Sequence, residues 1–231
     1  MEAVLLTRSS RDFDIKLAEA FVREGYKVFA IGGRGGAGGN VGDVCDAMDI
    51  EGVTLLPYDL RQAADIVKND VGKIDIYIEL SDERSEADNF TVREGLDELV
   101  IRSLYEENVM RPMATLEAFI ELLDAGEGKR LCFIASAKAS INETRAVDGY
   151  GYALGKAAMS NFYQMISNKL TPSGYTFRVY DPMSGEIEPE ASAEGAFNYF
   201  VRRRGTEREN PLRDDENRLV FRDALGREHT W

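Results

Sequence analysis

The chain has very few of the residues that build metal centres and disulfide scaffolds. Its 231 residues include two cysteines, Cys45 and Cys132, and one histidine, His229. Two cysteines cannot form a disulfide framework, and with one histidine they do not supply the four ligands of a structural zinc site. We expect Cys132 to be a core thiol because it lies in an apolar run, and His229 to lie in a frayed C-terminal tail.

Long apolar runs and an excess of positive charge are also missing. No stretch approaches the roughly 18 apolar residues that span a membrane, and the N-terminus lacks the basic and apolar regions of a signal peptide. The formal net charge is -13 and the isoelectric point about 4.7. A chain this acidic repels phosphate backbones, so we expect neither a nucleic-acid partner nor a membrane partner.

Short apolar runs alternate with helical patterns along the chain. Strands are predicted at 3–6, 27–31, 53–56, 74–78, 130–134 and 176–180, with a seventh at 219–221, and helices at 15–24, 63–69, 96–123 (bent near Pro112) and 152–170. This alternation predicts a single doubly wound α/β domain over 1–231, with six or seven parallel strands and helices on both faces. Ligands of such sheets bind beyond the carboxyl ends of the strands. The charged stretch 202–216 is expected to be an exposed excursion.

The strongest chemical motif is Tyr152-Ala-Leu-Gly-Lys156, which opens a predicted helix and follows Ile134-Ala-Ser136 at the end of a predicted strand. Residues four apart share one face of a helix. An ammonium beside a phenol favours the phenolate, so we expect the pKa of Tyr152 to fall below its usual value of ~10. Such a tyrosine passes a proton to or from a substrate oxygen, which Ser136 can also hydrogen-bond. The alternative is a surface tyrosine beside a solvated lysine, since the motif is short.

On these residues the chain resembles the short-chain dehydrogenase/reductase family over nearly its whole length. Ser136, Tyr152 and Lys156 fall where that family keeps its catalytic serine, tyrosine and lysine. The loop between serine and tyrosine is longer than usual, which makes Ser140 a second candidate for the serine. Asn108 matches the asparagine in the family's preceding long helix. The resemblance implies a Rossmann-type fold and catalytic roles for Asn108, Ser136, Tyr152 and Lys156, with Asn108 supporting a water relay to Lys156.

The first turn departs from the family. Its Thr-Gly-x-x-x-Gly-x-Gly fingerprint lets the backbone approach a pyrophosphate. Here Thr7-Arg-Ser-Ser-Arg-Asp-Phe-Asp14 puts Arg8, Asp12 and Asp14 at the glycine positions. The two carboxylates oppose a diphosphate, whereas Arg8 and Arg11 can compensate by pairing with it.

Other cofactor positions are partly retained. Asp59 matches an aspartate that contacts adenine, and Asp181-Pro182 matches the family's Pro-Gly turn, with Met183 in place of the glycine. The family's Asn-Asn-Ala-Gly is replaced by Glu79-Leu-Ser-Asp82. Arg34, in a glycine-rich loop, either pairs with a 2′-phosphate of NADP or is a solvated loop arginine. The resemblance implies that NAD or NADP is bound weakly or not at all, by Thr7, Arg8, Arg11, Arg34, Asp59, Lys156 and Pro182.

Three functions stay open at this point. The preferred one is a nicotinamide-dependent oxidoreductase that reduces a carbonyl or oxidises an alcohol, with Tyr152 as general acid/base. The second is a cofactor-independent lyase or isomerase, comparable to the halohydrin dehalogenases, although those use an arginine where this chain has Lys156. The third is a non-catalytic homologue. The resemblance also implies a small-molecule substrate, a cytoplasmic location and a homo-oligomer, either a dimer or a tetramer.

Overall fold

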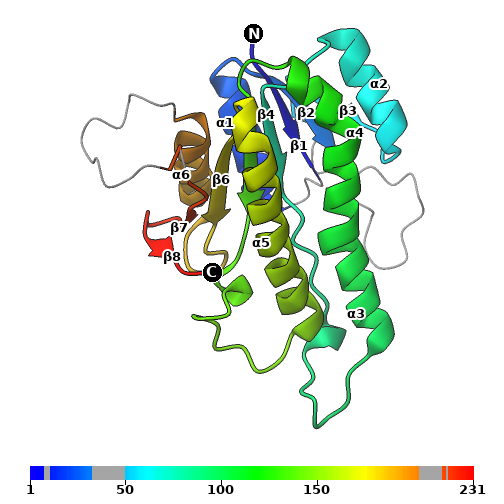
Figure 1. Cartoon of the computed structure of the whole chain (residues 1–231), viewed down its shortest axis with the longest axis vertical. Helices are drawn as coiled ribbons and strands as arrows, with labels where there is room; N and C mark the ends of the chain where they lie inside the picture. The colour runs from blue at the N-terminus through cyan, green and yellow to red at the C-terminus, as the bar shows by residue number, and fades with distance from the viewer. Residues whose placement is uncertain (8–10, 33–49, 203–214, 217) are drawn as a thin grey trace.

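A twisted sheet forms the centre of the molecule (Figure 1). The computed structural model describes residues 1–7, 11–32, 50–202, 215–216 and 218–231. The strands within these ranges are β1 (Ala3–Leu6), β2 (Lys27–Ile31), β3 (Val53–Leu56), β4 (Ile76–Glu79), β5 (Arg130–Ile134), β6 (Thr176–Asp181), β7 (Phe221–Asp223) and β8 (Glu228–His229). Their order is β3-β2-β1-β4-β5-β6-β7-β8. The predicted doubly wound sheet is confirmed, with one addition: the short β8 pairs antiparallel to β7.

The helices lie close to their predicted positions. They are α1 (Asp12–Arg23), α2 (Leu60–Asp70), α3 (Glu98–Tyr105), α4 (Arg111–Ala125), α5 (Tyr150–Leu170) and α6 (Pro189–Val201). A π-helical segment, Glu106–Met110, joins α3 to α4, so the expected irregularity in the long helix lies just before Pro112. The sequence analysis missed α6, whose alanines and aromatics make no clear apolar stripe. Among the described residues, no helix is long and apolar enough to cross a membrane.

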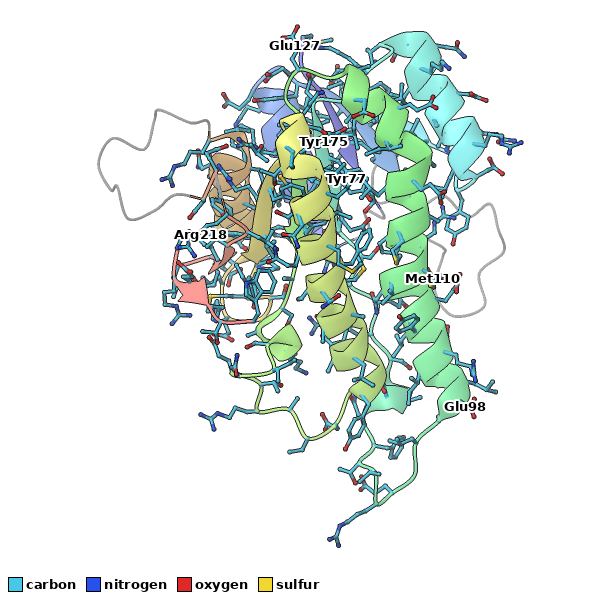
Figure 2. All side chains as sticks on the ribbon, in the orientation of Figure 1. Tyr77, Glu98, Met110, Glu127, Tyr175 and Arg218 are labelled. Atoms are coloured by element: carbon cyan, nitrogen blue, oxygen red, sulfur yellow. The ribbon has the colours of Figure 1, made fainter. Side chains whose placement is uncertain are left out.

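Alternating strand residues build two apolar layers, one on each face of the sheet. Leu5 and Tyr77 belong to the layer under α2, α4 and α5, where Figure 2 labels Tyr77. Val4 and Ile78 belong to the layer under α1 and α6. Successive side chains of a strand point to opposite faces, so runs that are apolar throughout fit strands covered on both sides. The order reverses between β1 and β4, which places the crevice of this fold at their carboxyl ends.

The α6 side of the sheet also contains a buried group of ion pairs. Arg178 is the largest fully buried side chain, and its guanidinium contacts Glu216 and donates to the carbonyl oxygen of Asp215. Arg130 donates two hydrogen bonds of 3.0 Å to Glu216. Arg222 forms a bidentate pair with the Asp215 carboxylate at 2.6 Å. The expectation of an exposed charged excursion is therefore wrong for its last two residues, which fasten the chain between α6 and β7.

We expect Glu216→Gln to lower the free energy of unfolding by about 3–5 kcal/mol, because it leaves two buried guanidinium groups without their carboxylate. Urea unfolding measures this change. The matched control is Glu194→Gln, which removes a carboxylate paired with the half-exposed Arg23. It should change stability by less than about 1 kcal/mol. Equal effects of the two substitutions would contradict the structural role given to Glu216.

Candidate active site

Four strand ends bring the candidate residues to one edge of the sheet. Thr7 follows β1, Asp82 follows β4 by three residues, Ser136 follows β5 and Pro182 follows β6. Because these strands are parallel, their carboxyl ends lie side by side, and the N-terminus of α5 approaches the same edge with Tyr152. The structure thus brings together residues that are up to 175 positions apart in the sequence, from Thr7 to Pro182.

A buried aspartate fixes the start of α5. The two carboxylate oxygens of Asp88 accept hydrogen bonds of 2.9 Å from the backbone amides of Gly151 and Tyr152. Carboxylates stabilise the amino ends of helices because several amides there have no helical partner. At Gly151 a Cβ atom would lie 2.9 Å from Leu104 Cδ1 and 3.1 Å from Ile101 Cα, so glycine lets α5 pack closely on α3. This close packing places Tyr152 in a buried position.

The Tyr152 hydroxyl and the Lys156 ammonium meet at one atom, Oδ1 of Asp82. Tyr152 donates to this oxygen over 2.6 Å, and Lys156 Nζ lies 3.3 Å from it. Lys156 also donates to the backbone carbonyls of Ser81 at 2.5 Å and Ile134 at 3.2 Å. The predicted pair therefore lies together, but both of its members are bonded to a carboxylate that the sequence analysis gave no role.

The second oxygen of the same carboxylate binds two arginines. Arg11 Nη1 lies 2.6 Å and Arg84 Nη2 lies 3.2 Å from Oδ2 of Asp82. Arg84 also donates to the Tyr152 hydroxyl over 3.1 Å, with its guanidinium 4.6 Å from the centre of the tyrosine ring. Burial would raise the pKa of Asp82, but Lys156, Arg11 and Arg84 outweigh burial and hold this pKa well below its usual range.

The expectation of a lowered tyrosine pKa is wrong for this arrangement. Burial and the charge of Asp82 raise the pKa of Tyr152 well above its usual value, although Arg84 acts in the opposite direction. Burial lowers the pKa of Lys156, while Asp82 opposes that change. The motif alone could not reveal this result, because the decisive carboxylate comes from a different strand. In this arrangement Tyr152 is a neutral hydrogen-bond donor.

Asn108 and Ser136 support the site in different ways. Asn108 lies in the π-helical segment, and its side-chain amide accepts from the backbone nitrogen of Glu83 at 2.7 Å and donates to its carbonyl at 2.8 Å. This fixes the backbone next to Asp82; the water relay to Lys156 stays a prediction. The Ser136 hydroxyl accepts from the Lys138 amide at 3.3 Å and slightly lowers the pKa of Tyr152.

The structure also separates Ser136 from its alternative, Ser140. Ser136 lines the cleft beside the tyrosine. Ser140 is buried, and its hydroxyl accepts from the backbone amide of Glu143 at 3.1 Å, within the following loop. Ser136 is therefore the better placed of the two to reach a ligand oxygen.

The candidate cofactor residues of the first turn are used within the protein. The Thr7 hydroxyl donates to the buried Glu79 carboxylate at 2.7 Å and accepts from the Leu80 amide at 3.0 Å. Arg11 precedes α1 and pairs with Asp14 at 2.8 Å, and Asp14 in turn accepts from the Arg11 backbone amide. Asp14, at one of the family's glycine positions, thus stabilises the first turn of α1.

The remaining cofactor candidates differ in position: Asp59 lies apart from this cluster, whereas Pro182 lies at the same strand ends. Asp59 caps α2 by accepting from the Gln62 amide at 2.9 Å and is exposed. Pro182 is buried, and its carbonyl accepts from the Ser192 hydroxyl. Met183 has a φ of 51°, a left-handed backbone that glycine adopts more readily. Arg8 and Arg34 lie outside the described residues.

Two adjoining cavities open beside the Tyr152 cluster. The first has a volume of about 340 Å³ and the second about 380 Å³. Both are lined by Pro182, Ser184 and Glu186. The first extends past Asp82, Arg84, Ser136 and Asp181, and the second past Arg11, Asp12 and Glu188. The wall of the first cavity is mostly polar, whereas that of the second combines apolar side chains such as Phe13 and Ile187 with more carboxylates than cations.

The expectation of a frayed tail at His229 is wrong. Its Nδ1 lies 2.5 Å from Oε2 of Glu143, and its Nε2 lies 3.2 Å from Oδ2 of Asp223. Thr230 donates to the other Glu143 oxygen through its backbone amide and its hydroxyl. The C-terminal residues therefore fasten the loop between Ser136 and α5, and His229 itself lines the first cavity.

Sequence reasoning missed several residues that organise this site. Asp82 offered a signal, because it follows a strand at the edge where ligands of this fold bind. Asp181 was noticed only as part of a turn, although its carboxylate accepts from the amides of Ala137 and Met183 at 2.8 Å. Arg84 and Asp88 lie in a loop whose sequence has no pattern that indicates their contacts. The described residues contain no group of three or more His, Cys, Asp or Glu side chains suited to a metal ion.

Comparisons with known proteins identify the fold. No family model matches the sequence, and no curated protein matches it. Among solved structures, the chain is similar to the carbonyl reductase Sniffer of D. melanogaster, with a TM-score of 0.77, 15% identity and full coverage of both chains (100% and 100%). A carbonyl reductase from Pseudomonas aeruginosa PAO1 in complex with NADP has a TM-score of 0.71 at 20% identity, and again 100% of both chains is covered.

A third similar structure is an oxidoreductase of the short-chain dehydrogenase/reductase family from Brucella ovis, in complex with a partially ordered NAD. Its TM-score is 0.67 at 17% identity, with 87% of this chain and 93% of that chain covered. At such identities the likeness establishes the fold: the chain has the short-chain dehydrogenase/reductase fold over its length. What it binds and which reaction it performs depend on the residues described above.

We expect Asp82→Asn to lower the pKa of Tyr152 by about one pH unit, because a negative charge is removed while Lys156 and Arg84 stay. Ultraviolet titration of each protein, minus the titration of its Tyr152→Phe counterpart, isolates the signal of this phenol. Glu186→Gln is the control, since it removes an exposed carboxylate from the same cavity. An unchanged Tyr152 titration in Asp82→Asn would contradict the role of Asp82.

The contacts of His229 with Glu143 and Asp223 predict that the stability of the fold depends on pH. Partial burial opposes the charge of His229, but hydrogen bonds to Glu143 and Asp223 outweigh it and raise the pKa. Asp181 also faces His229, and Arg227 pairs with Asp223 at 2.5 Å. A raised pKa stabilises the fold below the unfolded-state value and loses this effect as the pH rises through the folded-state value.

We therefore expect His229→Gln to destabilise the protein by roughly 0.5–1 kcal/mol at pH 6 and by much less at pH 9, allowing for solvent screening. Urea unfolding at both pH values measures the difference. The same comparison in a Glu143→Gln background should show a smaller pH dependence. A destabilisation that is equal at the two pH values would show that the charge of His229 is not involved.

Proposed function

We propose that the protein is a small-molecule oxidoreductase that reduces a carbonyl or oxidises an alcohol, with Tyr152 as the proton-transferring residue. One observation carries the proposal: the Tyr152 hydroxyl and the Lys156 ammonium converge on a single oxygen position, filled here by Oδ1 of Asp82. Ser136 lines the cavity beside this position. A substrate oxygen at that point would receive hydrogen bonds from donors that are already oriented, which is the arrangement that proton transfer requires.

The roles of the chain's own residues follow from their contacts. Tyr152 exchanges a proton with the substrate oxygen, and Ser136 orients that oxygen. Lys156 and Arg84 are the cations nearest to the phenol, so they favour its ionised form once the Asp82 carboxylate has moved away. Asn108 acts as a positioning residue because its amide fixes the backbone at Glu83. Asp88 has the same kind of role, since it fixes the helix end that carries Tyr152.

The nicotinamide half of a nicotinamide dinucleotide fits the site. The two donors that converge on Asp82 suit a hydroxyl-bearing ligand, and the two adjoining cavities meet at Pro182. Lys156 and Pro182 would contact the nicotinamide half, and Arg11 the diphosphate. When bound, the cofactor supplies or accepts the hydride. The diphosphate end fits poorly, because Asp12, Glu186 and Glu188 line the second cavity, so we expect weak affinity for both NAD and NADP.

A cofactor-independent enzyme on the same fold is the second candidate. It is favoured by the ion pairs of the first turn, where Arg11 and Asp14 bond to each other and Arg11 to Asp82. With the Arg11–Asp14 pair kept and the Asp82 carboxylate turned aside, Tyr152, Arg84 and Ser136 form a set of donors that would stabilise an oxyanion without a redox step.

Location and assembly belong to the same proposal. We propose a cytoplasmic homo-oligomer, a dimer or tetramer. Large apolar side chains are exposed on the helices of one face: Leu99, Tyr105, Met110, Met113, Leu154 and Met165. Met110 is labelled on this face in Figure 2. A second subunit would remove this apolar surface from water.

The proposal is tested by two tyrosine substitutions with NADH and NADPH against a panel of small carbonyl compounds. We expect Tyr152→Phe to lower turnover at least about a hundredfold, because it removes the transferred proton and keeps the ring. Tyr150→Phe should keep most of the activity, since Tyr150 is half-buried at the start of the same helix and has Leu154 four residues on. Full activity in Tyr152→Phe would contradict this mechanism, and absorbance of the reduced cofactor measures the rate.

A further inference from the structure

We propose that Asp82 is an internal competitor for the ligand: its carboxylate occupies the oxygen position between Tyr152 and Lys156, and a nicotinamide dinucleotide must displace it to bind. This inference rests on the proposed function, because it concerns the same site. It goes further by naming the residue that limits affinity for the cofactor and keeps the phenol protonated at rest.

Asp82 saturates the two donors that would bind a ligand oxygen. Oδ1 of Asp82 takes the Tyr152 hydroxyl at 2.6 Å and the Lys156 ammonium at 3.3 Å. The other two contacts of the ammonium are backbone carbonyls, of Ser81 and Ile134. A ligand oxygen can therefore reach both donors only at the point where Oδ1 lies.

The backbone that carries Asp82 is fixed on both sides. The Ser81 amide donates to the buried Glu79 carboxylate at 3.0 Å. The backbone of Glu83 makes two hydrogen bonds with the Asn108 amide. The carboxylate therefore leaves its position by rotation of the side chain, because the segment itself is held in place.

The outer oxygen of the Asp82 carboxylate has one partner that is largely exposed to solvent. Oδ2 contacts Arg84, whose side chain is 52% exposed, and Arg11, whose side chain is 29% exposed. An ion pair with a solvated arginine such as Arg84 costs little to break, whereas Arg11 is also held by Asp14 and by the carbonyl oxygen of Leu80. Asp82 can thus turn toward the cleft and lose its contact with Arg84 at little cost, while Tyr152 and Lys156 are freed for a ligand.

Displacement also changes the charge at the phenol. With the carboxylate in place, Asp82 offsets part of the positive charge of Lys156 and the two arginines around Tyr152. With it turned away, Lys156 and Arg84 stay beside the hydroxyl and favour the phenolate. The same movement therefore makes room for a ligand oxygen and adapts Tyr152 to proton transfer, so binding and activation are coupled through one side chain.

The experiment compares wild type, Asp82→Ala and the control Glu186→Gln for binding of NADPH, NADH and ADP by calorimetry. Both substitutions remove one negative charge from the same cavity, but only the first vacates the Tyr152–Lys156 position. When a side chain blocks a binding site, the apparent affinity for the ligand is the intrinsic affinity multiplied by the fraction of time in which the site is free. We expect Asp82→Ala to tighten NADPH or NADH binding by at least about tenfold. Glu186→Gln removes a carboxylate from the diphosphate end, so it should tighten the binding of NADPH, NADH and ADP alike, and by less than Asp82→Ala tightens the dinucleotides.

ADP tests the adenosine and diphosphate half of the cofactor site alone. It has the adenosine and the diphosphate but no nicotinamide ribose, so its affinity should be nearly the same in Asp82→Ala and in wild type. If ADP and the dinucleotides gain affinity equally, the effect is general electrostatics and the inference is overturned. If the dinucleotides bind wild type and Asp82→Ala equally well, the inference fails while the proposed function stands.

Absence of dinucleotide binding to every variant would overturn both the inference and the nicotinamide-dependent function. Circular dichroism checks the fold of each variant. If Asp82→Ala does not fold, Asp82→Asn replaces it. The asparagine keeps the shape of the side chain but has no charge, so its interaction with Lys156 is weaker than the ion pair of Asp82. A gain of at least about threefold in dinucleotide affinity is then expected, and no gain would overturn the inference.

Discussion

Carboxylates that lose contact with water must find cations or donors, and this requirement shapes the edge of the sheet where the strands end. Asp82 has three cationic partners and one phenol, Glu79 binds two hydroxyl groups and an amide, and Asp88 binds two amides of α5. Each carboxylate therefore also connects segments that are distant in the sequence. The position of Tyr152 depends on two of them, because Asp88 fixes its backbone and Asp82 its hydroxyl.

The same principle operates on the α6 side of the sheet with the opposite balance of charge. There the buried group is Arg178, and the carboxylate of Glu216 and several backbone carbonyls come to it. Fully buried ion pairs gain little over apolar packing but are costly to break, so they specify which segments meet more than they add stability. In both places, charges that look like surface residues in the sequence determine the arrangement of the chain.

The sequence was sufficient for the fold because fold information is local and repetitive. The alternation of apolar runs with helical spacing predicted a doubly wound fold. It also predicted the positions of most helices and strands, with α6 and β8 as the exceptions. The motif residues Ser136, Tyr152 and Lys156 were also found and do lie together. Their electrostatic state was not predictable, because it depends on Asp82, whose approach to Tyr152 is a tertiary contact over 70 residues. The same limit explains the wrong expectation for His229, whose partner Glu143 lies 86 residues away.

A site that is fully satisfied at rest has a consequence for how it can work. The ion pairs around Asp82 stabilise the empty site, and a ligand must replace their interactions before it gains anything of its own. Sites tuned for activity commonly contain unsatisfied or strained groups and are less stable for that reason. Here the strain is small and lies nearby, at the left-handed backbone of Met183. The balance between stability and activity at this edge of the sheet therefore rests on how easily one side chain, Asp82, exchanges its partners.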